Sequence, residues 1–562
     1  MNIPDRSPNA AGVPGNTAIS FTRVDSATLR ARLAAAAVAR GTELAVIDVR
    51  ETLAFSAAHL IFSSNLSHNR LELEAGSALP RRDVPIVIVD ADETLATTAA
   101  IRLRTLGYTD IALLKGGVQQ WKRDGHPIYA GFNVRSKAFA ECVAHAKQTP
   151  YIDFDALSGG PVNRYVILDS RTLAEYRNAT VPGAVHVPGA DLVRVVRDLL
   201  PDDTTAVVVA CGGRTRSIIG AQSLIDAGLP NPVYALRNGT GGMRLRGQPL
   251  EHGASRHAQT PSSAALAWAS NAAAQTTPAA RLINAKQYRT WREDPTRTLY
   301  TFDLRGTVSS GKAHVPDSVN IAGGQLIQEI DLHAPVVGAR VVLVDDDDLV
   351  RARMTGHWLA GLGGFEVALL CNSDVDRLND VSPRETNGIA DPDIPAYASI
   401  TADKLAQVLA ANPKDIAILD LSRSTAYRAA HLPGARWILR ETLPETVAAM
   451  TPAQAVIITS EDGRLAAFAW SDWRGAAGGA HAGTFARVRV LAGGNRAWFD
   501  AGLPVEHDTH PPANPFPDVW VGPQARGTDV LTHVRAYLDW EIDLVRQVEN
   551  DPDFNVLTQL NR

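Results

Sequence analysis

The sequence predicts an α/β fold in which mainly parallel sheets carry helices on both faces. Short apolar runs with strand character alternate with amphipathic stretches such as residues 27–33 and 405–409. That alternation is typical of parallel sheets whose strands are connected by helices. The same order of runs also occurs four times along the chain, which indicates four copies of one structural unit.

The first recognisable element of each copy is an apolar run that ends in aspartate. The four aspartates are Asp48, Asp169, Asp303 and Asp420. A second strand-like run follows in each copy and ends, in order, at Asp90, Cys211, Asp345 and Ser460. The two end points are 42 residues apart in the first three copies and 40 in the fourth. Because reactive groups of such sheets lie at the carboxyl ends of strands, we expect a site at the second end point.

Only the second copy has a thiol at this position. Cys211 is followed by a short loop and then by residues with helical spacing; the loop residues are Gly212, Gly213, Arg214, Thr215, Arg216 and Ser217. Backbone amides at a helix start, the helix dipole and two arginines all favour a thiolate, so we expect a nucleophilic cysteine with a lowered pKa. Arg216 accompanies the cysteine, because the other copies have Leu95, Val350 and Leu465 at its position.

The loop from Cys211 to Ser217 has the form C-x-x-x-x-R-S and resembles the active-site loop of the rhodanese family of sulfurtransferases. Other motifs resemble that family too: Tyr176, Tyr427, the segments 181–184 and 431–435, and the Gly-Gly elements that end at Trp121 and Trp498. The resemblance covers most of residues 20–507 and is to the tandem four-domain rhodaneses of bacteria. The loop departs from the family pattern at Gly213 and Arg214, where the usual glycine is at the fourth loop position.

The resemblance implies that Cys211 takes a sulfane sulfur from thiosulfate or a related donor as a persulfide and passes it to a thiol or cyanide acceptor. Loop residues 212–217 would bind the donor and stabilise the persulfide, with Arg214 either binding the donor or holding the loop. Asp169 and Arg171 are interpreted as mainly structural supporting residues, because the same D-x-R pair occurs in copies that lack the thiol. No cofactor and no metal are implied.

Two other classes of function remain open. One is a non-catalytic scaffold, in which Cys211 carries or senses a persulfide for a protein partner and the other three copies provide docking surfaces. The other is a thiol-dependent phosphatase or arsenate reductase on the same fold. The loop disfavours that class, because related phosphatases have one more residue between cysteine and arginine.

Composition shifts divide the chain into segments. The expected organisation is a cysteine-free, inactive rhodanese-like domain at 1–130, a catalytic domain at 131–254, a linker at 255–280, an inactive domain at 281–378, a linker at 379–398, an inactive domain at 399–507, and a proline-rich linker with a C-terminal helix at 508–562. Apolar residues at helical spacing place that helix over residues 530–548. It would pack on a domain or on another subunit, which makes a homo-oligomer a possible assembly.

Charge and cysteine content exclude several partners. The 562 residues carry a net charge of −5 with a pI near 6.3 and no basic stripe, so neither nucleic acid nor an anionic membrane is an expected partner. Three cysteines cannot form a disulfide framework in a chain of this length, which indicates a reducing compartment. The start of the sequence has no apolar signal core, and no run of 18 apolar residues occurs. We therefore expect a cytoplasmic protein.

The remaining candidate residues have structural interpretations. Neither Cys142 nor Cys371 is the residue at which the second strand-like run of a copy ends, and both are expected to be inert. His59, His314 and His431 share one position in the repeat, which favours a role in the fold over metal binding. The acidic run 345–348 suggests a cation site, but carboxylates at a helix start are a sufficient explanation.

Overall fold

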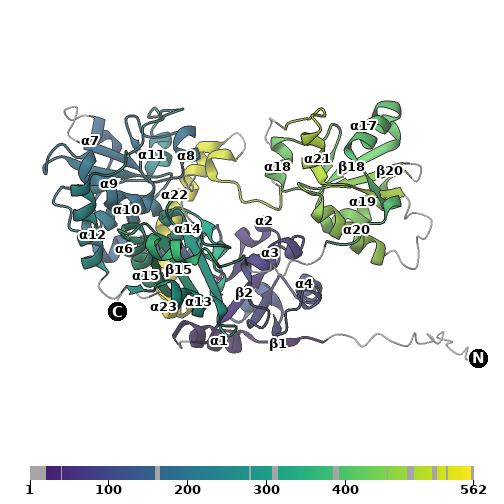
Figure 1. Cartoon of the computed structure of the whole chain (residues 1–562), viewed down its shortest axis with the longest axis horizontal. Helices are drawn as coiled ribbons and strands as arrows, with labels where there is room; N and C mark the ends of the chain where they lie inside the picture. The colour runs from purple at the N-terminus through teal and green to yellow at the C-terminus, as the bar shows by residue number, and fades with distance from the viewer. Residues whose placement is uncertain are drawn as a thin grey trace, which may run out of the picture.

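The structure is a computed structural model that describes residues 20–38, 41–158, 165–277, 280–306, 314–383, 391–451, 454–476, 487–508, 516–526 and 529–558. The N-terminal segment 1–19, residues 384–390 of the linker expected at 379–398, and residues 509–515 of the proline-rich linker lie outside this part. The described residues contain four mainly parallel sheets together with helices, as the sequence predicts (Figure 1). The four sheets share one strand order, which confirms the α/β class and the internal repeat.

The first sheet has the order β1 (Thr22–Val24), β5 (Ile111–Leu114), β4 (Ile86–Val89), β2 (Leu44–Asp48), with β3 (Ser64–Asn65) on β2. Its helices are α1 (Ser26–Val38), α2 (Thr52–Ala57), α3 (Leu71–Ala78), α4 (Thr94–Thr105) and α5 (Gly117–Arg123). One further strand, β14 (Val336–Val337), comes from the third repeat and pairs antiparallel with β2. The first and third repeats are therefore joined through one sheet.

The second sheet contains the strand that precedes Cys211. Its order is β6 (Tyr151–Ile152), β10 (Val233–Leu236), β9 (Ala206–Ala210), β7 (Tyr165–Asp169) and β8 (Val185–His186). Its helices are α6 (Val134–Lys147), α7 (Phe154–Ser158), α8 (Leu173–Asn178), α9 (Leu192–Leu199), α10 (Thr215–Asp226) and α11 (Gly239–Leu245). Strand β9 is central and every residue of it is buried, which explains its continuous rather than alternating apolar run.

The third sheet has the order β11 (Arg281–Leu282), β16 (Glu366–Cys371), β15 (Arg340–Asp345), β12 (Leu299–Asp303) and β13 (Val319–Asn320). Its helices are α13 (Ala285–Glu293), α14 (Gly323–His333), α15 (Val350–Leu362) and α16 (Asn372–Val375). The segment expected as a linker at 255–280 contains helix α12 (Ser263–Thr276). This helix lies against α9 and α15, so it bridges the second and third repeats.

The fourth sheet has the order β17 (Ser399–Ile400), β21 (Val488–Leu491), β20 (Ala455–Thr459), β18 (Ile416–Asp420) and β19 (Arg436–Trp437). Its helices are α17 (Ala402–Ala411), α18 (Ser424–Ala429), α19 (Leu443–Ala449), α20 (Arg464–Ala476) and α21 (Gly494–Asp500). This repeat stands on the right of Figure 1, beside the first repeat. Arg440 joins the two through an ion pair of 2.6 Å with Glu72.

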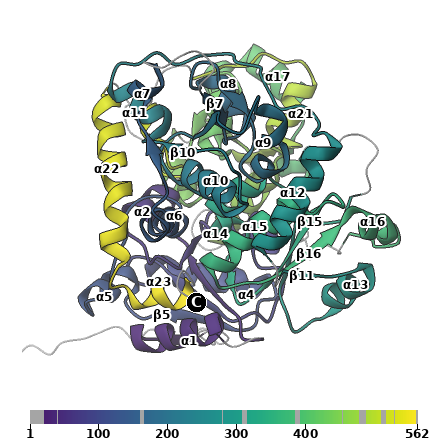
Figure 2. The same cartoon turned by 90° about the vertical axis from the view of Figure 1, so that its left-hand side faces the viewer.

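The C-terminal helix has the bounds that the sequence predicts. Helix α22 (Val530–Val548) lies against α6 and α11 of its own chain and is followed by α23 (Pro552–Leu557), which lies against α1. Figure 2 shows α22 in yellow along one side of the molecule, from beside α11 down to α23. Its apolar residues Val534, Leu538, Leu544 and Val548 are buried within the chain. The helix therefore packs on a domain, the first of its two expected locations.

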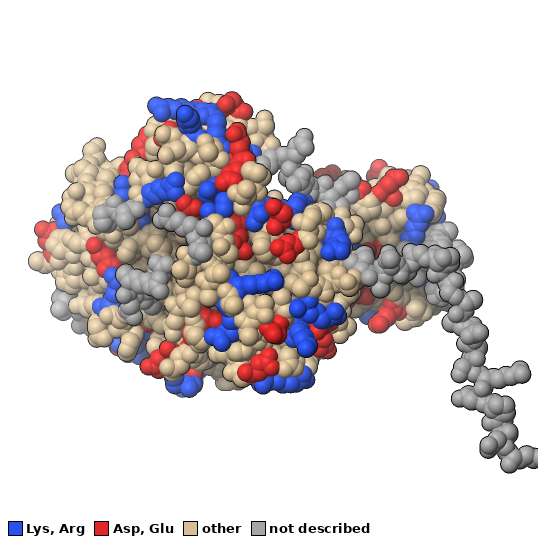
Figure 3. Space-filling model, turned by 90° about the horizontal axis from the view of Figure 1, so that it is seen from below, with Lys and Arg blue, Asp and Glu red and all other residues tan. Residues whose placement is uncertain are grey.

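The visible surface shows no concentration of one charge. On the face drawn in Figure 3, basic and acidic side chains are interspersed. None of the described helices combines the length and the apolar character that a membrane span needs.

Candidate active site around Cys211

Cys211 lies where the sequence places it, between the end of β9 at Ala210 and the start of α10 at Thr215. The residue is 2% exposed. Its Sγ donates a hydrogen bond of 3.4 Å to Oγ of Ser217. The Ser217 hydroxyl in turn donates to the carbonyl of Arg214 at 2.8 Å. The thiol is thus held inside its loop, with the start of a helix facing it.

The equivalent loop of the first repeat shows what this loop can bind. There the carboxylate of Asp90 accepts hydrogen bonds from the amides of Glu93, Leu95 and Ala96 at 2.7, 2.7 and 3.0 Å. These three amides belong to the positions that Arg214, Arg216 and Ser217 occupy in the second repeat. The first-repeat loop therefore holds an anion with its backbone amides, with Glu93 at a φ of +79° where Arg214 has a φ of −130°. In the second repeat, Cys211 with its sulfur occupies the position of Asp90.

Arg216 is held beside the cysteine by a carboxylate. Its guanidinium donates two hydrogen bonds, of 2.8 and 2.7 Å, to Glu175 and one of 2.8 Å to Gln325 on α14. Burial would raise the pKa of the Glu175 carboxyl, but the bonds and charge of Arg216 outweigh it and lower that pKa to about 2. Nε of Arg216 is buried without a hydrogen-bond partner in the described part of the chain. The Nε–H group of Arg216 is therefore available to donate a hydrogen bond to a bound molecule.

Arg214 points away from the thiol and holds the loop. Its Nε and Nη2 donate to the Glu141 carboxylate on α6 at 2.6 and 2.7 Å. Further bonds of 3.0 Å reach Asn238 and the Tyr151 hydroxyl. Of the two roles left open for this arginine, the geometry supports anchoring of the loop.

The pKa of Cys211 differs from the sequence-based expectation. Burial raises the pKa of this thiol, and the charge of Arg216 and the Ser217 hydrogen bonds lower it too little to compensate. The arginine and the helix start are present as predicted, but desolvation of a thiolate outweighs them. The prediction of a lowered pKa was therefore wrong for the closed site.

A raised pKa has a measurable consequence. The rate of alkylation of Cys211 by iodoacetamide is expected to increase about tenfold per pH unit up to and beyond pH 8, because only the thiolate reacts. The rate should be followed on the Cys211 peptide by mass spectrometry, which separates it from Cys142 and Cys371. A rate that levels off below pH 7 would show a preformed thiolate and contradict this result.

Asp169 and Arg171 lie under the loop. Arg171 donates to the Asp169 carboxylate at 2.9 and 2.6 Å and to the carbonyl of Ala179 at 2.6 Å. Arg50 makes the same contacts with Asp48 and Ala58 in the first repeat, which has no thiol. The pair is thus an element of the fold. Arg171 also approaches within 3.9 Å of where a side chain on Gly212 would begin, which fits a supporting position.

The C-terminal helix closes the other side of the loop. Thr215 donates a hydrogen bond of 2.9 Å to Oε1 of Glu541 on α22. A Cβ added to Gly213 would lie 2.9 Å from Oε2 of the same carboxylate and 3.4 Å from the Tyr537 ring. The glycine at 213, where the loop departs from the family pattern, is therefore explained by the close approach of α22.

The other residues that the sequence singled out lie elsewhere. Cys142 is half-buried on α6, and burial raises its pKa to about 11. Cys371 ends β16. The acidic run at 345–348 is neutralised by arginines, since Arg351 pairs with Asp345 at 2.8 Å and Arg194 with Asp348 at 2.9 Å. The described residues hold no group of His, Cys, Asp and Glu side chains arranged for a metal ion.

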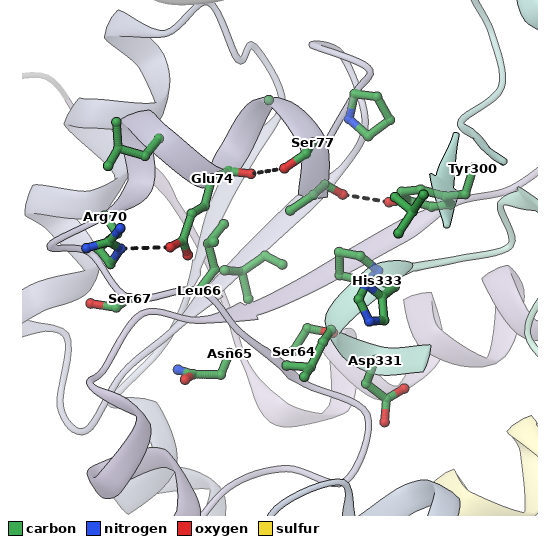
Figure 4. A pocket seen from close by; sticks show the side chains of 18 of the residues that line it. Ser64, Asn65, Leu66, Ser67, Arg70, Glu74, Ser77, Tyr300, Asp331 and His333 are labelled. Carbon is green, nitrogen blue, oxygen red and sulfur yellow. Dashed lines mark hydrogen bonds and ion pairs between the residues drawn. The ribbon is translucent and has the colours of Figure 1, made fainter. Parts of the chain in front are cut away.

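A cavity of about 950 Å³ lies away from Cys211. It is lined by residues of the first, third and fourth repeats together with Phe132, Asp518, Val519 and Trp520. Figure 4 shows Arg70 and Glu74 of the first repeat on one side, and Tyr300, Asp331 and His333 of the third repeat on the other. None of the predicted site residues lines it. The thiol is instead enclosed by the helices around its loop.

Sequence reasoning missed the acidic residues of the site. Glu141, Glu175 and Glu541 come from α6, α8 and α22, and each contacts a residue of the loop. Glu541 had a signal that could have found it. It lies three residues after Leu538 and three before Leu544, on the buried stripe of α22, where an acidic residue is unusual.

The family model for the rhodanese-like domain matches residues 27–124, 155–243 and 401–501, which together are about half of the chain. These ranges leave out the third sheet, although its strand order is that of the other three.

The chain is similar over most of its length to a thiosulfate sulfurtransferase whose structure has been solved. The crystal structure of thiosulfate sulfurtransferase from Pseudomonas aeruginosa is 38% identical, with a TM-score of 0.85, over 95% of this chain and 99% of that one. Thiosulfate sulfurtransferase of Gallus gallus is 29% identical over 118 residues, which are 19% of this chain and 39% of the chicken protein. The matched motifs, the repeated fold and these similarities show that the chain belongs to the rhodanese family.

Proposed function

We propose that the protein is a sulfurtransferase that moves a sulfane sulfur from thiosulfate or a related donor, through a persulfide on Cys211, to a thiol or cyanide. The similarity to two thiosulfate sulfurtransferases supports the reaction class. The loop of the first repeat supports the site, because three of its amides bind the Asp90 carboxylate. The corresponding amides of the second repeat would hold the anionic end of a persulfide.

The chemistry divides into two displacements. The thiolate of Cys211 attacks the outer sulfur of thiosulfate, a new S–S bond forms, and sulfite leaves with the electron pair of the old one. The outer sulfur of the persulfide lies within the amides of Arg214, Arg216 and Ser217 and near the Arg216 guanidinium, which stabilise its charge. Cyanide then attacks that sulfur, thiocyanate leaves, and the Cys211 thiolate is restored. The two half-reactions give ping-pong kinetics.

Access to the thiol is part of the proposal. Because Cys211 is 2% exposed, a donor reaches it when the helices around the loop separate. The three cysteines are unpaired, and all of them lie in the described part of the chain. Unpaired thiols and a persulfide both suit a reducing compartment, and we propose the cytoplasm.

The test is the intact mass of the protein before and after incubation with thiosulfate. We expect a gain of one sulfur atom that cyanide removes and that Cys211→Ser abolishes. The Cys142→Ser variant is the matched control and should gain the same mass as the wild type. A gain with an organic persulfide only would change the donor, whereas no gain with any donor would favour the non-catalytic scaffold.

A further inference from the structure

Glu541 has a buried carboxylate, and one of its two oxygens has no hydrogen-bond partner among the described residues. Its side chain lies on α22 and the residue is 1% exposed. Oε1 accepts the hydrogen bond of 2.9 Å from Thr215. Oε2 is also buried, yet no hydrogen bond reaches it from the part of the chain that the structure describes. Buried polar atoms without a partner are rare in proteins, and a catalytic role is one explanation for them.

The free oxygen is directed at the cysteine loop. A Cβ on Gly213, two residues after Cys211, would lie 2.9 Å from Oε2. The carboxylate also acts electrostatically on Cys211, and the sign of that effect is to disfavour the thiolate. A hydrogen-bond acceptor at this distance from the loop can contact a molecule that enters it.

The charged and titratable groups around Glu541 do not neutralise it. They are Cys211, Arg214 and Arg216 of the loop, Lys137 and Glu141 of α6, Tyr151 of β6, and Tyr537 of its own helix, whose side chain interacts with the carboxylate. Arg214 is paired with Glu141 and Arg216 with Glu175. Lys137 donates to the carbonyl of Phe132 at 2.5 Å and lies among the rings of Trp520, Tyr537 and Trp540. None of these three cations forms an ion pair with Glu541 among the described residues.

We propose that Glu541 carries the proton when sulfur moves between two thiols. The assignment depends on the sulfurtransferase function proposed above. The acceptor R–SH gives its proton to Oε2, and the resulting thiolate attacks the outer sulfur of the persulfide anion. The S–S bond to Cys211 breaks, R–S–S⁻ leaves, and the proton on Glu541 passes to the Cys211 thiolate. The net change is R–SH plus Cys–S–S⁻ to R–S–S⁻ plus Cys–SH, with no oxidant or reductant.

This role separates two kinds of acceptor. A thiol must lose a proton before it attacks, and so must hydrogen cyanide, whereas the sulfite anion has none to lose. A proton carrier therefore accelerates transfer to a thiol and leaves transfer to sulfite, which regenerates thiosulfate, unchanged. A residue that only maintained the loop would affect both acceptors equally.

The experiment uses the full-length protein loaded with sulfur from thiosulfate and freed of excess donor. Single-turnover transfer is then measured to glutathione and to sulfite for the wild type and for Glu541→Gln, whose side chain keeps its size and an acceptor for Thr215. At about pH 8, where glutathione is still mainly a thiol and sulfite is an anion, we expect transfer to glutathione to slow by about 10²-fold, with transfer to sulfite within twofold. Asp539→Asn removes an exposed carboxylate from the same helix and should change neither rate.

The pH dependence gives a second readout. As the pH rises past the pKa of glutathione, the acceptor is already a thiolate, so the difference between Glu541→Gln and the wild type should close. Equal slowing with both acceptors, or a defect that stays constant with pH, would overturn the proton-carrying role. So would an unchanged rate with glutathione. Failure of the wild type to load sulfur is seen before either acceptor is added, and it would overturn the proposed function together with this role.

Discussion

Replacement of Gly239 by alanine is expected to slow sulfur loading on Cys211 by at least about 10²-fold. Gly239 begins α11 with a φ of +52°, and a Cβ there would lie 2.2 Å from the carbonyl oxygen of Cys211 and 2.9 Å from that of Gly213. Both contacts are with backbone, so the loop itself must move. Displacement of a reacting group by about 1 Å costs on the order of 10²-fold in rate. We therefore expect a loss of at least about 10²-fold in the rate of cyanide-dependent turnover.

The fourth repeat provides a matched control for this variant. Gly494 has a φ of +61°, and its Cβ would lie 2.2 Å from the carbonyl oxygen of Ser460, the residue at the position of Cys211. Gly494→Ala should lower the thermal stability of the protein in the same way but leave sulfur loading intact, because that loop has no thiol. Equal loss of activity in both variants would show that the reaction depends on the whole assembly and not on the geometry of one loop.

The fold could be predicted because its pattern is local and repeated. Each central strand is buried on both faces, so its residues form an unbroken apolar run that can be seen in the sequence. The number of residues between Asp169 and Cys211 then follows from strand and helix lengths, and it recurs in the first and third copies. Helix α22 was predicted with its true bounds for the same reason, since its apolar spacing is continuous.

The surroundings of Cys211 could not be predicted in the same way. Arg214 and Glu541 are more than 300 residues apart in the sequence, and no local pattern shows that α22 returns to this loop. The pKa of Cys211 illustrates the consequence. The sequence shows the arginine that lowers this pKa, whereas the burial that raises it depends on how the folded chain encloses the loop.

Arg214→Ala is expected to reduce stability strongly while leaving the apparent donor constant unchanged within about twofold. The guanidinium is 8% exposed and its nitrogens are occupied by Glu141, Asn238 and Tyr151. Removal of one partner of a buried ion pair costs about 3–5 kcal/mol, because the other charge is left without a partner. Differential scanning calorimetry measures the first effect. Initial rates over a range of thiosulfate concentrations, at a temperature where the variant is folded, measure the second.

The pH dependence and a second substitution test whether the unpaired Glu141 carboxylate causes the loss of stability in Arg214→Ala. Burial raises the pKa of Glu141 even in the intact protein, and loss of Arg214 removes the cation that opposes this. Because the folded form then binds a proton more tightly than the unfolded form, the stability of Arg214→Ala falls as the pH rises. The loss of stability of Arg214→Ala relative to the wild type should therefore be largest at neutral pH and smaller in acid. Adding Glu141→Gln should recover part of it at neutral pH, since no charge stays buried. A raised donor constant with normal stability would instead assign Arg214 to donor binding.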